Sequence, residues 1–496
     1  MALAGEVKAS WVAAAVTLAV GIIALNQALV GVFYDDGLYA GLAIALSTGM
    51  GYVHPNLPHT PAAVHYPPLY PVVLAPLFGV LSVNGAALAA KILNAILGAA
   101  AAGLITWHAA RSELLGPGTP RWLAPLIVAA AGIAIPVLAT QTVLFAEPLF
   151  AVLLAIVIVF ADRGDRPWIV GGAAALVLLT RSIGIAGAAG VVVFLLTRRA
   201  PRRALVAVLI PVVAAGLAWA IWVETHQHAV DPELALGYGN YSSHLSQAGL
   251  SAIAVNVPDL SRPLEVITLG WIPVRWVYDV CATLALGVGL YGVAVLVRRS
   301  SIGWSLIFYL LILAVWPHPP DRFLWAVLPW LGLAWAAGGL ELWRRWPRVR
   351  VPLALLVSLI AGGFVYYEAR GFAGRWWDAQ ARIISANFAE LLPIMRQLPD
   401  TAVVASDDEA LVWLYSRRKS VPLYLERYRG REAIKPTPAE QVAYLERMGV
   451  THILLASASS PSAGQLKALI DADPKLLTAL YRWSDGRWLF EVNRAH

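Results

Sequence analysis

The sequence predicts an α-helical polytopic membrane protein that ends in a small α/β domain. Of its 496 residues, 59% are hydrophobic and only 14% are charged, whereas soluble globular proteins carry about 25% charged residues. Apolar runs of about 18 residues, the length of a membrane-spanning helix, recur as far as residue 368. From residue 369 to 496, short β-type runs alternate with helical patterns, which indicates a separate α/β domain.

The positions of the membrane spans follow from apolar length. Lys8 precedes the first apolar stretch, which lacks a convincing cleavage site, so we expect an uncleaved first span rather than a signal peptide. Eleven spans are predicted, which makes residues 1–368 the transmembrane domain; they cover residues 11–33, 84–109, 122–141, 145–161, 168–181, 184–197, 204–223, 277–297, 302–316, 322–342 and 351–368.

The basic residues orient these spans, because loops on the cytoplasmic side of a membrane are enriched in lysine and arginine. The outer loops hold only Arg181, Arg262, Arg275 and Arg322, and residues 34–68 contain no basic residue. The N-terminus is therefore expected in the cytoplasm and residues 369–496 outside it. The alternate loops hold the basic clusters Arg111 and Arg121; Arg163 and Arg166; Arg198, Arg199, Arg202 and Arg203; Arg298 and Arg299; and Arg344, Arg345, Arg348 and Arg350.

The net charge of +7 has the same origin. The basic residues are spread over short clusters between apolar runs and form no single patch, so no nucleic-acid partner is expected. The one cysteine, Cys281, lies in an apolar run; an intrachain disulfide is impossible, and nothing indicates a thiolate catalyst.

For three stretches, apolar length alone does not decide whether they span the membrane, and we use the alternation of basic and non-basic loops. Residues 67–82 are apolar but contain four prolines, and a span there would reverse the side of every later basic loop, so we expect an interfacial or re-entrant helix. Residues 168–197 must cross twice, with a turn that places Arg181 at the outer surface. Residues 36–48 are too few to span and are predicted to form a helix in the membrane interface.

The C-terminal segment is predicted to contain three strands and three helices. The strands are expected at "AVVAS" (402–406), "THILLAS" (451–457) and "GRWLFEVN" (486–493), and the helices at "DEALVWLYSRR" (408–418), "EQVAYLERMGV" (440–450) and "AGQLKALIDADPKLLTALYRW" (463–483).

Two adjacent carboxylates, Asp35 and Asp36, follow directly on the first predicted span. One aspartate would suffice to cap the interfacial helix and to complement its dipole. A second acid adds repulsion at the membrane edge, where ionisable groups are costly and usually functional. A carboxylate at the outer face can act as a general base towards a substrate hydroxyl, and the pair could also hold a divalent cation.

The sequence around this pair resembles a known family. "YDDGLYAGLAIALSTGMGY" followed by "HYPPLYPVVLAPLF" is similar to the first external loop of GT-C fold glycosyltransferases, in particular the bacterial relatives of protein O-mannosyltransferases and lipid A aminoarabinose transferases. "LFAEPLF" (144–150), "LLTRSIGIA" (178–186), "DRFLWAVLPWL" (321–331) and "AVVASDDEALVWLYSRRKSVP" (402–422) follow in the expected order.

The resemblance implies a transferase at the outer face of a bacterial cytoplasmic membrane. Such enzymes move a sugar from a polyprenyl-phosphate donor to a hydroxyl of a lipid, glycan or protein acceptor. The first acid of the pair is the family's proposed base, here Asp35, and the implied step is an inverting displacement. The aminoarabinose transferases carry a lysine before the paired prolines; this chain has Tyr66 there, after His65, so the expected substrate contacts near Asp35 are Asp36, His65 and Tyr66.

Three further residues are candidates for substrate binding. Arg181 lies on the outer side against the charge rule, and its planar fork suits phosphate oxygens, although a helix-end arginine can also simply reach towards water. Arg322 is similar but stands beside Asp321, so a local ion pair is an equal alternative. Glu147 precedes Pro148 at the start of a span, where it could cap the helix or assist Asp35.

Histidines gather in the predicted outer loops, at His54, His59, His65, His226, His228, His244 and His318. Their spacings do not match a zinc site, so we expect them in loops or against substrate, with no assigned metal and a divalent cation left open.

Two other classes of function fit parts of the sequence. A transporter or lipid flippase would explain many spans, but transporters usually show paired repeats and ionisable residues near the bilayer midplane. A non-catalytic assembly protein would use the C-terminal domain as a receptor. A transferase explains best why polar residues gather at the outer ends of the spans.

Overall fold

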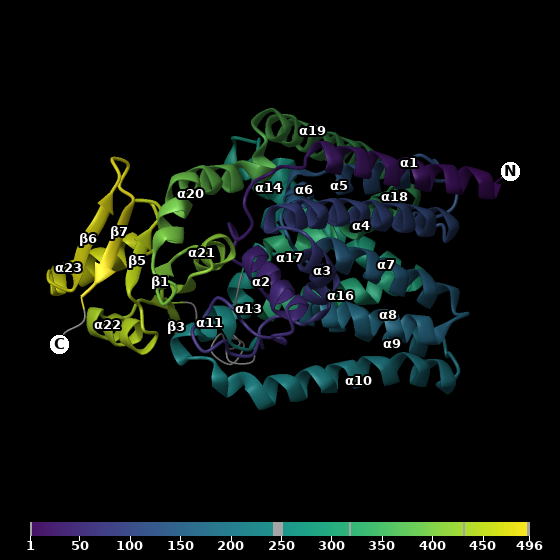
Figure 1. Ribbon diagram of the computed structural model, residues 1–496. Coiled ribbons are helices and arrows are strands. Elements are labelled where there is room, and N and C mark those ends of the chain that lie inside the picture. Colours follow the sequence, from purple (N-terminus) through teal and green to yellow (C-terminus); the bar gives the residue numbers. More distant parts are fainter. Residues whose placement is uncertain (1, 242–250, 317–318, 430–431, 494–496) are drawn as a thin grey trace. The chain divides into compact units, whose positions relative to one another are not determined.

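The computed structural model describes residues 2–241, 251–316, 319–429 and 432–493 (Figure 1). It divides into two compact units. Unit 1 comprises Met1–Leu25, Lys91–Ala220 and Leu250–Trp377, and unit 2 comprises Asn26–Ala90, Ile221–Gly249 and Asp378–His496. This division differs from the predicted boundary at residue 368, because two segments of the N-terminal part belong to unit 2.

Unit 1 is helical in the residues that the structure describes. Its α-helices are α1 (Ala2–Ile23), α4 (Val83–Arg111, which begins in unit 2), α5 (Leu123–Gly132), α6 (Ile135–Thr142), α7 (Glu147–Arg163), α8 (Pro167–Thr180), α9 (Ile185–Thr197), α10 (Arg202–His226, which ends in unit 2), α13 (Ser251–Asp259), α14 (Arg262–Leu269), α15 (Arg275–Arg299), α16 (Ser301–Val315), α17 (Asp321–Ala326), α18 (Leu328–Arg345) and α19 (Arg350–Gly374).

All eleven predicted spans contain helix, and prolines break two of them. The stretch 122–141 bends by 54° between α5 and α6, because Pro136 cannot continue the hydrogen-bond ladder of the preceding turn. The stretch 322–342 is split into α17 and α18 at a helix start that contains Pro329. Among the described residues, four helices are long and apolar enough to cross a membrane, or five if the bent pair is one span. The count of eleven spans stays a prediction.

The predicted limits of the first span are wrong. Helix α1 ends at Ile23 and not at residue 33. Asn26 explains part of the difference, since its side-chain oxygen accepts a hydrogen bond from the Ala28 N–H at 3.1 Å and so competes with helical bonding. The Ala24 carbonyl accepts a hydrogen bond from the Trp377 indole at 2.9 Å, which satisfies the end of the helix. Asp35 is therefore separated from the first helix by a non-helical segment.

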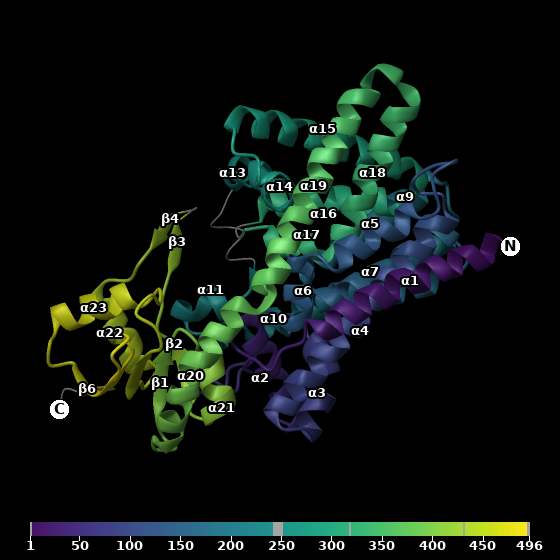
Figure 2. The same cartoon turned by 90° about the horizontal axis from the view of Figure 1, so that it is seen from above.

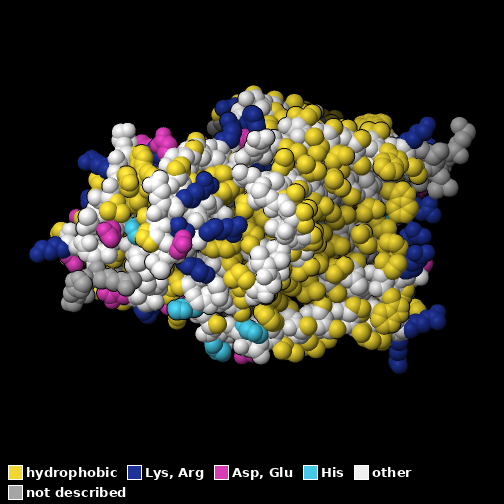
Figure 3. Space-filling view, viewed as in Figure 1, with side chains coloured by type: hydrophobic (Ala, Val, Ile, Leu, Met, Phe, Trp, Pro, Cys, Tyr) yellow, Lys and Arg dark blue, Asp and Glu magenta, His cyan; other side chains and the backbone are white. Residues whose placement is uncertain are grey.

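The helices of unit 1 pack closely and expose apolar faces. Helices α15 and α18 lie side by side (Figure 2) and touch at glycines; a Cβ on Gly292 would lie 1.8 Å from the Ala334 carbonyl oxygen. On the outside, Leu217, Leu290 and Leu355 are more than half exposed, and hydrophobic side chains cover the helical region in Figure 3. Such apolar surface is typical of helices in lipid.

Hydrogen bonds join the five basic loops at one end of the unit 1 helices. They run from Arg299 to the Leu114 carbonyl (2.9 Å), from Arg344 to the Leu115 carbonyl (2.9 Å), from Arg198 to the Arg298 carbonyl (3.0 Å) and from the Ser301 N–H to Asp162 (2.7 Å). The loops that the alternation of basic clusters assigned to one side thus lie together. Which side faces the cytoplasm stays a prediction.

Unit 2 combines the C-terminal α/β domain with the chain around Asp35. Its helices are α2 (Asp35–Ser47), α3 (Leu69–Val80), α11 (Ala235–Tyr238), α20 (Ala379–Gln397), α21 (Glu409–Ser416), α22 (Pro438–Arg447) and α23 (Ala463–Ala472). Its strands are β1 (Val403–Ser406), β2 (Lys419–Pro422), β3 (Arg427–Arg429), β4 (Glu432–Ile434), β5 (His452–Leu455), β6 (Leu477–Arg482) and β7 (Trp488–Val492). Helices α2 and α3 match the predicted non-spanning helices at 36–48 and 67–82.

The main sheet has the strand order β2-β1-β5-β7-β6. Strand β1 pairs in parallel with β2 and β5, whereas β7 runs antiparallel to β5 and β6. The three predicted strands and the first two predicted helices of this domain are confirmed. The predicted helix 463–483 is only half correct, because it ends at Ala472 and residues 477–482 form β6. In β6, pairing with β7 overrides the helical pattern of "KLLTALYRW".

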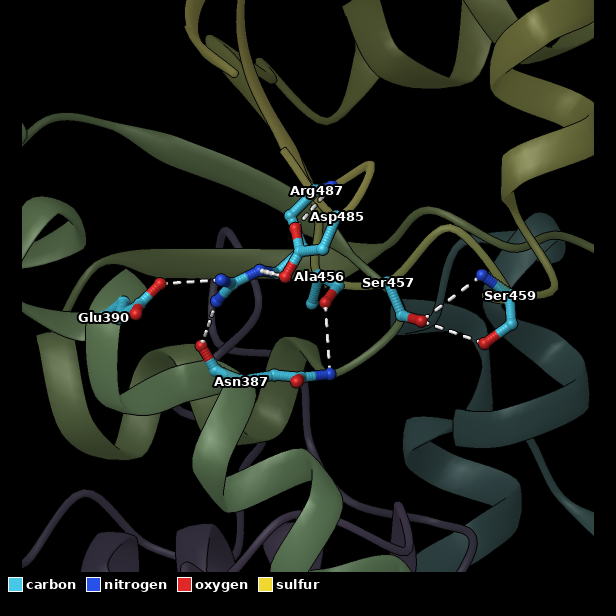
Figure 4. Close-up of polar contacts among 7 residues, drawn as sticks. All are labelled: Asn387, Glu390, Ala456, Ser457, Ser459, Asp485 and Arg487. Carbon is cyan, nitrogen blue, oxygen red and sulfur yellow. Dashed lines mark hydrogen bonds and ion pairs between the residues drawn. The ribbon is translucent and has the colours of Figure 1, made fainter. Parts of the chain in front are cut away.

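Arg487 ties the sheet to α20 (Figure 4). Its guanidinium is buried and donates to the Asn387 carbonyl at 2.8 Å, to Glu390 at 2.6 Å and to Asp485 at 2.7 Å. Asn387 in turn donates to the Ala456 carbonyl, which lies just beyond β5. Helix α20 and the N-terminal segment then share one core with the sheet, formed by Val32, Phe388, Leu391, Met395, Val404, Leu411, Val412, Leu454 and Leu489.

Candidate active site

The backbone before Asp35 is strained. Tyr34 has φ 66° and ψ −72°, and the Asp35 N–H donates to the Phe33 carbonyl at 2.8 Å, which together form a tight γ-turn. A positive φ is uncommon for a bulky residue, and such strain concentrates at functional sites. Asp35 is the first residue of α2 and remains half-buried. The turn therefore fixes the direction in which this carboxylate leaves the backbone.

Asp36 is turned towards its own loop. Its Oδ2 accepts hydrogen bonds from the N–H groups of Gly31 (2.7 Å) and Val32 (3.3 Å), and its Oδ1 accepts one from Phe33 (2.9 Å). The side chain is 1% exposed, and burial raises the pKa of Asp36 although the backbone hydrogen bonds oppose the rise. The two adjacent acids thus differ: one holds the loop and the other stays accessible. A substrate contact of Asp36 stays a prediction.

We expect Asp36→Asn to destabilise the protein more than Asp35→Asn does. An amide nitrogen cannot accept a hydrogen bond, so at least one buried N–H of residues 31–33 loses its partner, at a cost of about 1–3 kcal/mol. At the half-buried Asp35 the same change should cost less than about 0.5 kcal/mol. Melting temperatures of the two purified variants in detergent measure the difference. Equal melting temperatures would contradict this role of Asp36.

Tyr66 contacts Asp35 directly. Its hydroxyl donates to Asp35 Oδ1 at 2.6 Å, and its backbone carbonyl is held by the Tyr52 hydroxyl at 2.7 Å. The ring packs against that of Tyr39 with centroids 4.8 Å apart, and Tyr39 packs on Tyr70 at 5.1 Å. Burial raises the pKa of Tyr66 well above its usual value, so the phenol remains a donor. Tyr66 is held by its packing in the aromatic cluster, and its hydroxyl orients the Asp35 carboxylate.

His65 belongs to the same cluster. Its ring lies 4.5 Å from that of Tyr66 and 4.3 Å from that of Tyr241. Its Nδ1 lies 2.6 Å from the Gly239 carbonyl oxygen, which can only accept, so Nδ1 carries the proton in this arrangement. The structure thus brings together Asp35, Asp36, His65 and Tyr66, as the sequence predicts.

Sequence reasoning missed a buried polar group next to this cluster. The Tyr238 hydroxyl donates to Glu409 at 2.8 Å and accepts from the Asn56 amide at 2.8 Å. His54 lies against the Tyr238 ring at 4.7 Å; both of its ring nitrogens are buried without a hydrogen-bond partner, and burial lowers the pKa of His54 to about 3. Glu409 is 1% exposed, and burial raises the pKa of its carboxyl to about 8. The sequence feature that could have indicated this group is the run of three acidic residues at 407–409.

In unit 1, the structure brings together the other three predicted residues. Arg181 forms an ion pair with Glu147 Oε1, and Arg322 reaches the same oxygen at 2.7 Å. Each guanidinium also lies over an aromatic ring, Arg181 over Phe323 at 4.3 Å and Arg322 over Phe145 at 4.4 Å. Helix α8 ends just before Arg181, whereas α7 and α17 begin at Glu147 and just before Arg322, so the predicted outer helix ends converge here.

Two arginines meet one carboxylate in this group. Glu147 is 2% exposed, and its Oε2 is buried without a hydrogen-bond partner. Paired arginine side chains of this kind can bind an anion such as a phosphate. Arg322 reaches Glu147 at 2.7 Å, and a local ion pair with Asp321 stays a prediction.

Two predicted spans contain a buried ionisable side chain. Lys91 in α4 is 3% exposed and Glu368 in α19 is 8% exposed, and both lie inside predicted membrane helices. Glu368 accepts a hydrogen bond from the Ile135 N–H at 2.9 Å, at the start of α6. A lone ionisable residue in an apolar run was the signal for both. Across the described ranges, no group of three or more histidine, cysteine or acidic side chains could hold a metal ion.

Comparison with known proteins shows the fold. No family model and no curated protein matches the sequence. The chain is similar to the archaeal oligosaccharyltransferase AglB from Archaeoglobus fulgidus in complex with an inhibitory peptide and a dolichol-phosphate, with 12% identity, a TM-score of 0.51, and 99% of this chain and 74% of that chain covered. The same enzyme tethered with an acceptor peptide gives 11% identity and a TM-score of 0.54 over the same shares.

A further similar structure is ArnT from Cupriavidus metallidurans bound to undecaprenyl phosphate, with 16% identity, a TM-score of 0.49, and 97% of each chain covered. The similarity to the oligosaccharyltransferase, which extends over nearly the whole chain, confirms the predicted GT-C fold.

Proposed function

We propose that this protein is a membrane glycosyltransferase that moves a sugar from a polyprenyl-phosphate donor to an acceptor hydroxyl, with inversion at the anomeric carbon. The observation that supports it best is the half-buried carboxylate of Asp35, held by a strained turn and by Tyr66 in a GT-C fold. The related fold was solved with a dolichol-phosphate, so this architecture accommodates a polyprenyl phosphate. The donor would carry a hexosyl or pentosyl group, and the acceptor would be a lipid, glycan or protein.

Asp35 would act as the general base. Its carboxylate accepts the proton of the acceptor hydroxyl while the oxygen attacks the anomeric carbon and the bond from that carbon to the phosphate oxygen breaks. The products are the glycosylated acceptor and a polyprenyl phosphate, and the proton passes from Asp35 to water. Tyr66 holds the carboxylate oriented, and Asp36 holds the loop behind it.

Arg181 and Arg322 would bind the donor phosphate. The leaving phosphate gains negative charge as the bond breaks, so cations stabilise it and no second catalytic acid is required. Arginine forks match phosphate oxygens, and the two rings beneath the guanidiniums keep them in place. Before the donor binds, the negative charge of Glu147 would offset the repulsion between the two arginines.

We further propose that the protein resides in a bacterial cytoplasmic membrane, with its N-terminus inside and its C-terminal domain outside. The reaction would then use donors and acceptors at the outer face.

The test uses the purified full chain in detergent with synthetic polyprenyl-phosphate hexoses and pentoses. We expect release of free polyprenyl phosphate with at least one donor, stimulated by a membrane extract that supplies the acceptor. The same protein in vesicles with a labelled donor distinguishes a flippase: movement of intact donor between leaflets, without cleavage of any donor, would contradict the proposal.

A further inference from the structure

We infer that the C-terminal domain positions the catalytic loop, and that Glu409 at the start of α21 is the positioning residue, acting through Tyr238 and Tyr34. This inference rests on the proposed function of Asp35. It gives the C-terminal domain a role in the reaction. If this domain were only a receptor, it would take no part in the chemistry.

Helix α21 lies directly against the backbone around Asp35 and Asp36. A Cβ on Gly31, where φ is +98°, would lie 2.8 Å from the Cα of Leu411, and a Cβ on Gly37 would lie 2.6 Å from the Cβ of Ala410. Only glycine allows this approach at either side of the acidic pair. The loop and the first turn of α21 are therefore in backbone contact.

Hydrogen bonds to the C-terminal domain hold the segment that leads into the loop. The Leu29 N–H donates to Ser385 Oγ at 2.8 Å, and the Val30 N–H donates to the Tyr415 hydroxyl at 3.0 Å. Ser385 belongs to α20 and Tyr415 to α21. On the opposite flank, Lys419 donates to the carbonyls of Pro55 and Leu57 at 2.7 and 3.0 Å. The C-terminal domain thus holds the segment that leads into Asp35 and the segment at residues 55–57.

Glu409 is connected to the strained turn through two tyrosines. The Tyr238 hydroxyl donates a hydrogen bond to Glu409, and the Tyr238 ring packs against that of Tyr34. The two rings are edge to face, with centroids 5.9 Å apart. Glu409 therefore determines where Tyr238 points, and Tyr238 determines where Tyr34 is held.

Tyr34 transmits this constraint to Asp35. It is the central residue of the γ-turn, and its hydroxyl rests against Gly237, where an added Cβ would lie 1.9 Å away. A strained turn persists only where its surroundings fix it. Loss of the Tyr34 packing on Tyr238 or on Gly237 would let the turn relax and rotate the Asp35 carboxylate away from its productive direction.

The test compares kcat and donor KM among full-length variants. Glu409→Leu, Tyr238→Phe and Gly237→Ala should each lower kcat about 10- to 100-fold, because a shift of about 1 Å in a catalytic group costs on that order. Donor KM should change less than about threefold. Glu409→Gln keeps an acceptor oxygen for Tyr238 and should retain kcat within about threefold of wild type, as expected for rescue by a conservative change.

Two comparisons separate positioning from loss of fold. Tyr444→Phe removes another buried tyrosine hydroxyl of the same domain, which donates to the Pro422 carbonyl at 3.1 Å, and should leave kcat unchanged. The double variant Glu409→Leu with Tyr238→Phe should be no slower than the slower single variant, since both break one chain of contacts.

The inference is overturned if wild type is active and depends on Asp35 while Tyr238→Phe and Gly237→Ala keep full kcat. It is also overturned if these variants lose activity only in proportion to the fraction of folded protein. Absence of transfer by wild type with any donor would instead count against the proposed function.

Discussion

Replacing Asp35 by asparagine is expected to reduce sugar transfer about 10³-fold. General-base catalysis contributes about 10²–10⁴ in rate, and an amide cannot accept the acceptor proton. The shape of the side chain is conserved, and the Tyr66 hydroxyl can still donate to the remaining oxygen, so the fold and donor binding should persist. Initial rates of polyprenyl phosphate release, with donor affinity and melting temperature measured in parallel, check this prediction.

A matched control exists in the same unit. Asp231 also begins a helical turn, where it accepts the Glu233 N–H at 2.8 Å, and it has no assigned role in the reaction. Asp231→Asn should leave the rate within about twofold of wild type, because Asp231 has no role in the reaction. An Asp35→Asn protein that kept more than about a tenth of the wild-type rate would show that Asp35 is not the base.

Replacing Arg181 by glutamine is expected to raise the donor KM about 30- to 100-fold. Wild type has two arginines on one carboxylate, and the variant leaves a neutral pair of Arg322 with Glu147 that no longer favours an anion. A hydrogen-bonded charge is worth about 1.5–3 kcal/mol, which corresponds to this change in affinity. Arg181→Lys retains the charge but loses the two-pronged geometry, so its donor KM should fall between the two.

Two variants test whether Arg181 only holds the helices together. Arg275→Gln removes an exposed arginine of unit 1 that pairs with Asp279, and it should not change the donor KM. Glu147→Gln combined with Arg181→Gln removes one charge of each sign, so that Glu147 no longer neutralises Arg322. Recovery of donor affinity in this double variant supports phosphate binding; a KM unchanged in Arg181→Gln would rule it out.

The helices and their loops could be predicted because each depends on local chemistry. Apolar runs define the helices, and clustered arginines define which loops lie together, as the contacts of Arg299 and Arg344 confirm. The order of short motifs around Asp35 indicated the GT-C fold, which the similar solved structures confirm. The alternation of loops placed Glu147, Arg181 and Arg322 at outer helix ends, but it did not predict that they meet.

What the sequence could not predict depends on contacts between distant segments. The end of α1 is set partly by Trp377, far along the chain, and β6 exists because β7 pairs with it. The contact of Glu409 with Tyr238 joins residues that no local pattern connects. The positive φ of Tyr34 likewise could not be predicted from the residue type, since that conformation depends on its neighbours in space.

The anomeric configuration of the product tests the central claim most directly, because loss of activity in Asp35→Asn would also follow if Asp35 were a nucleophile. Nuclear magnetic resonance of the sugar transferred by wild-type protein from a donor of known configuration gives the answer. If Asp35 removes the acceptor proton in a single displacement, the configuration is inverted and no sugar becomes attached to the protein. Retention of configuration, or a sugar covalently bound to Asp35, would contradict the account.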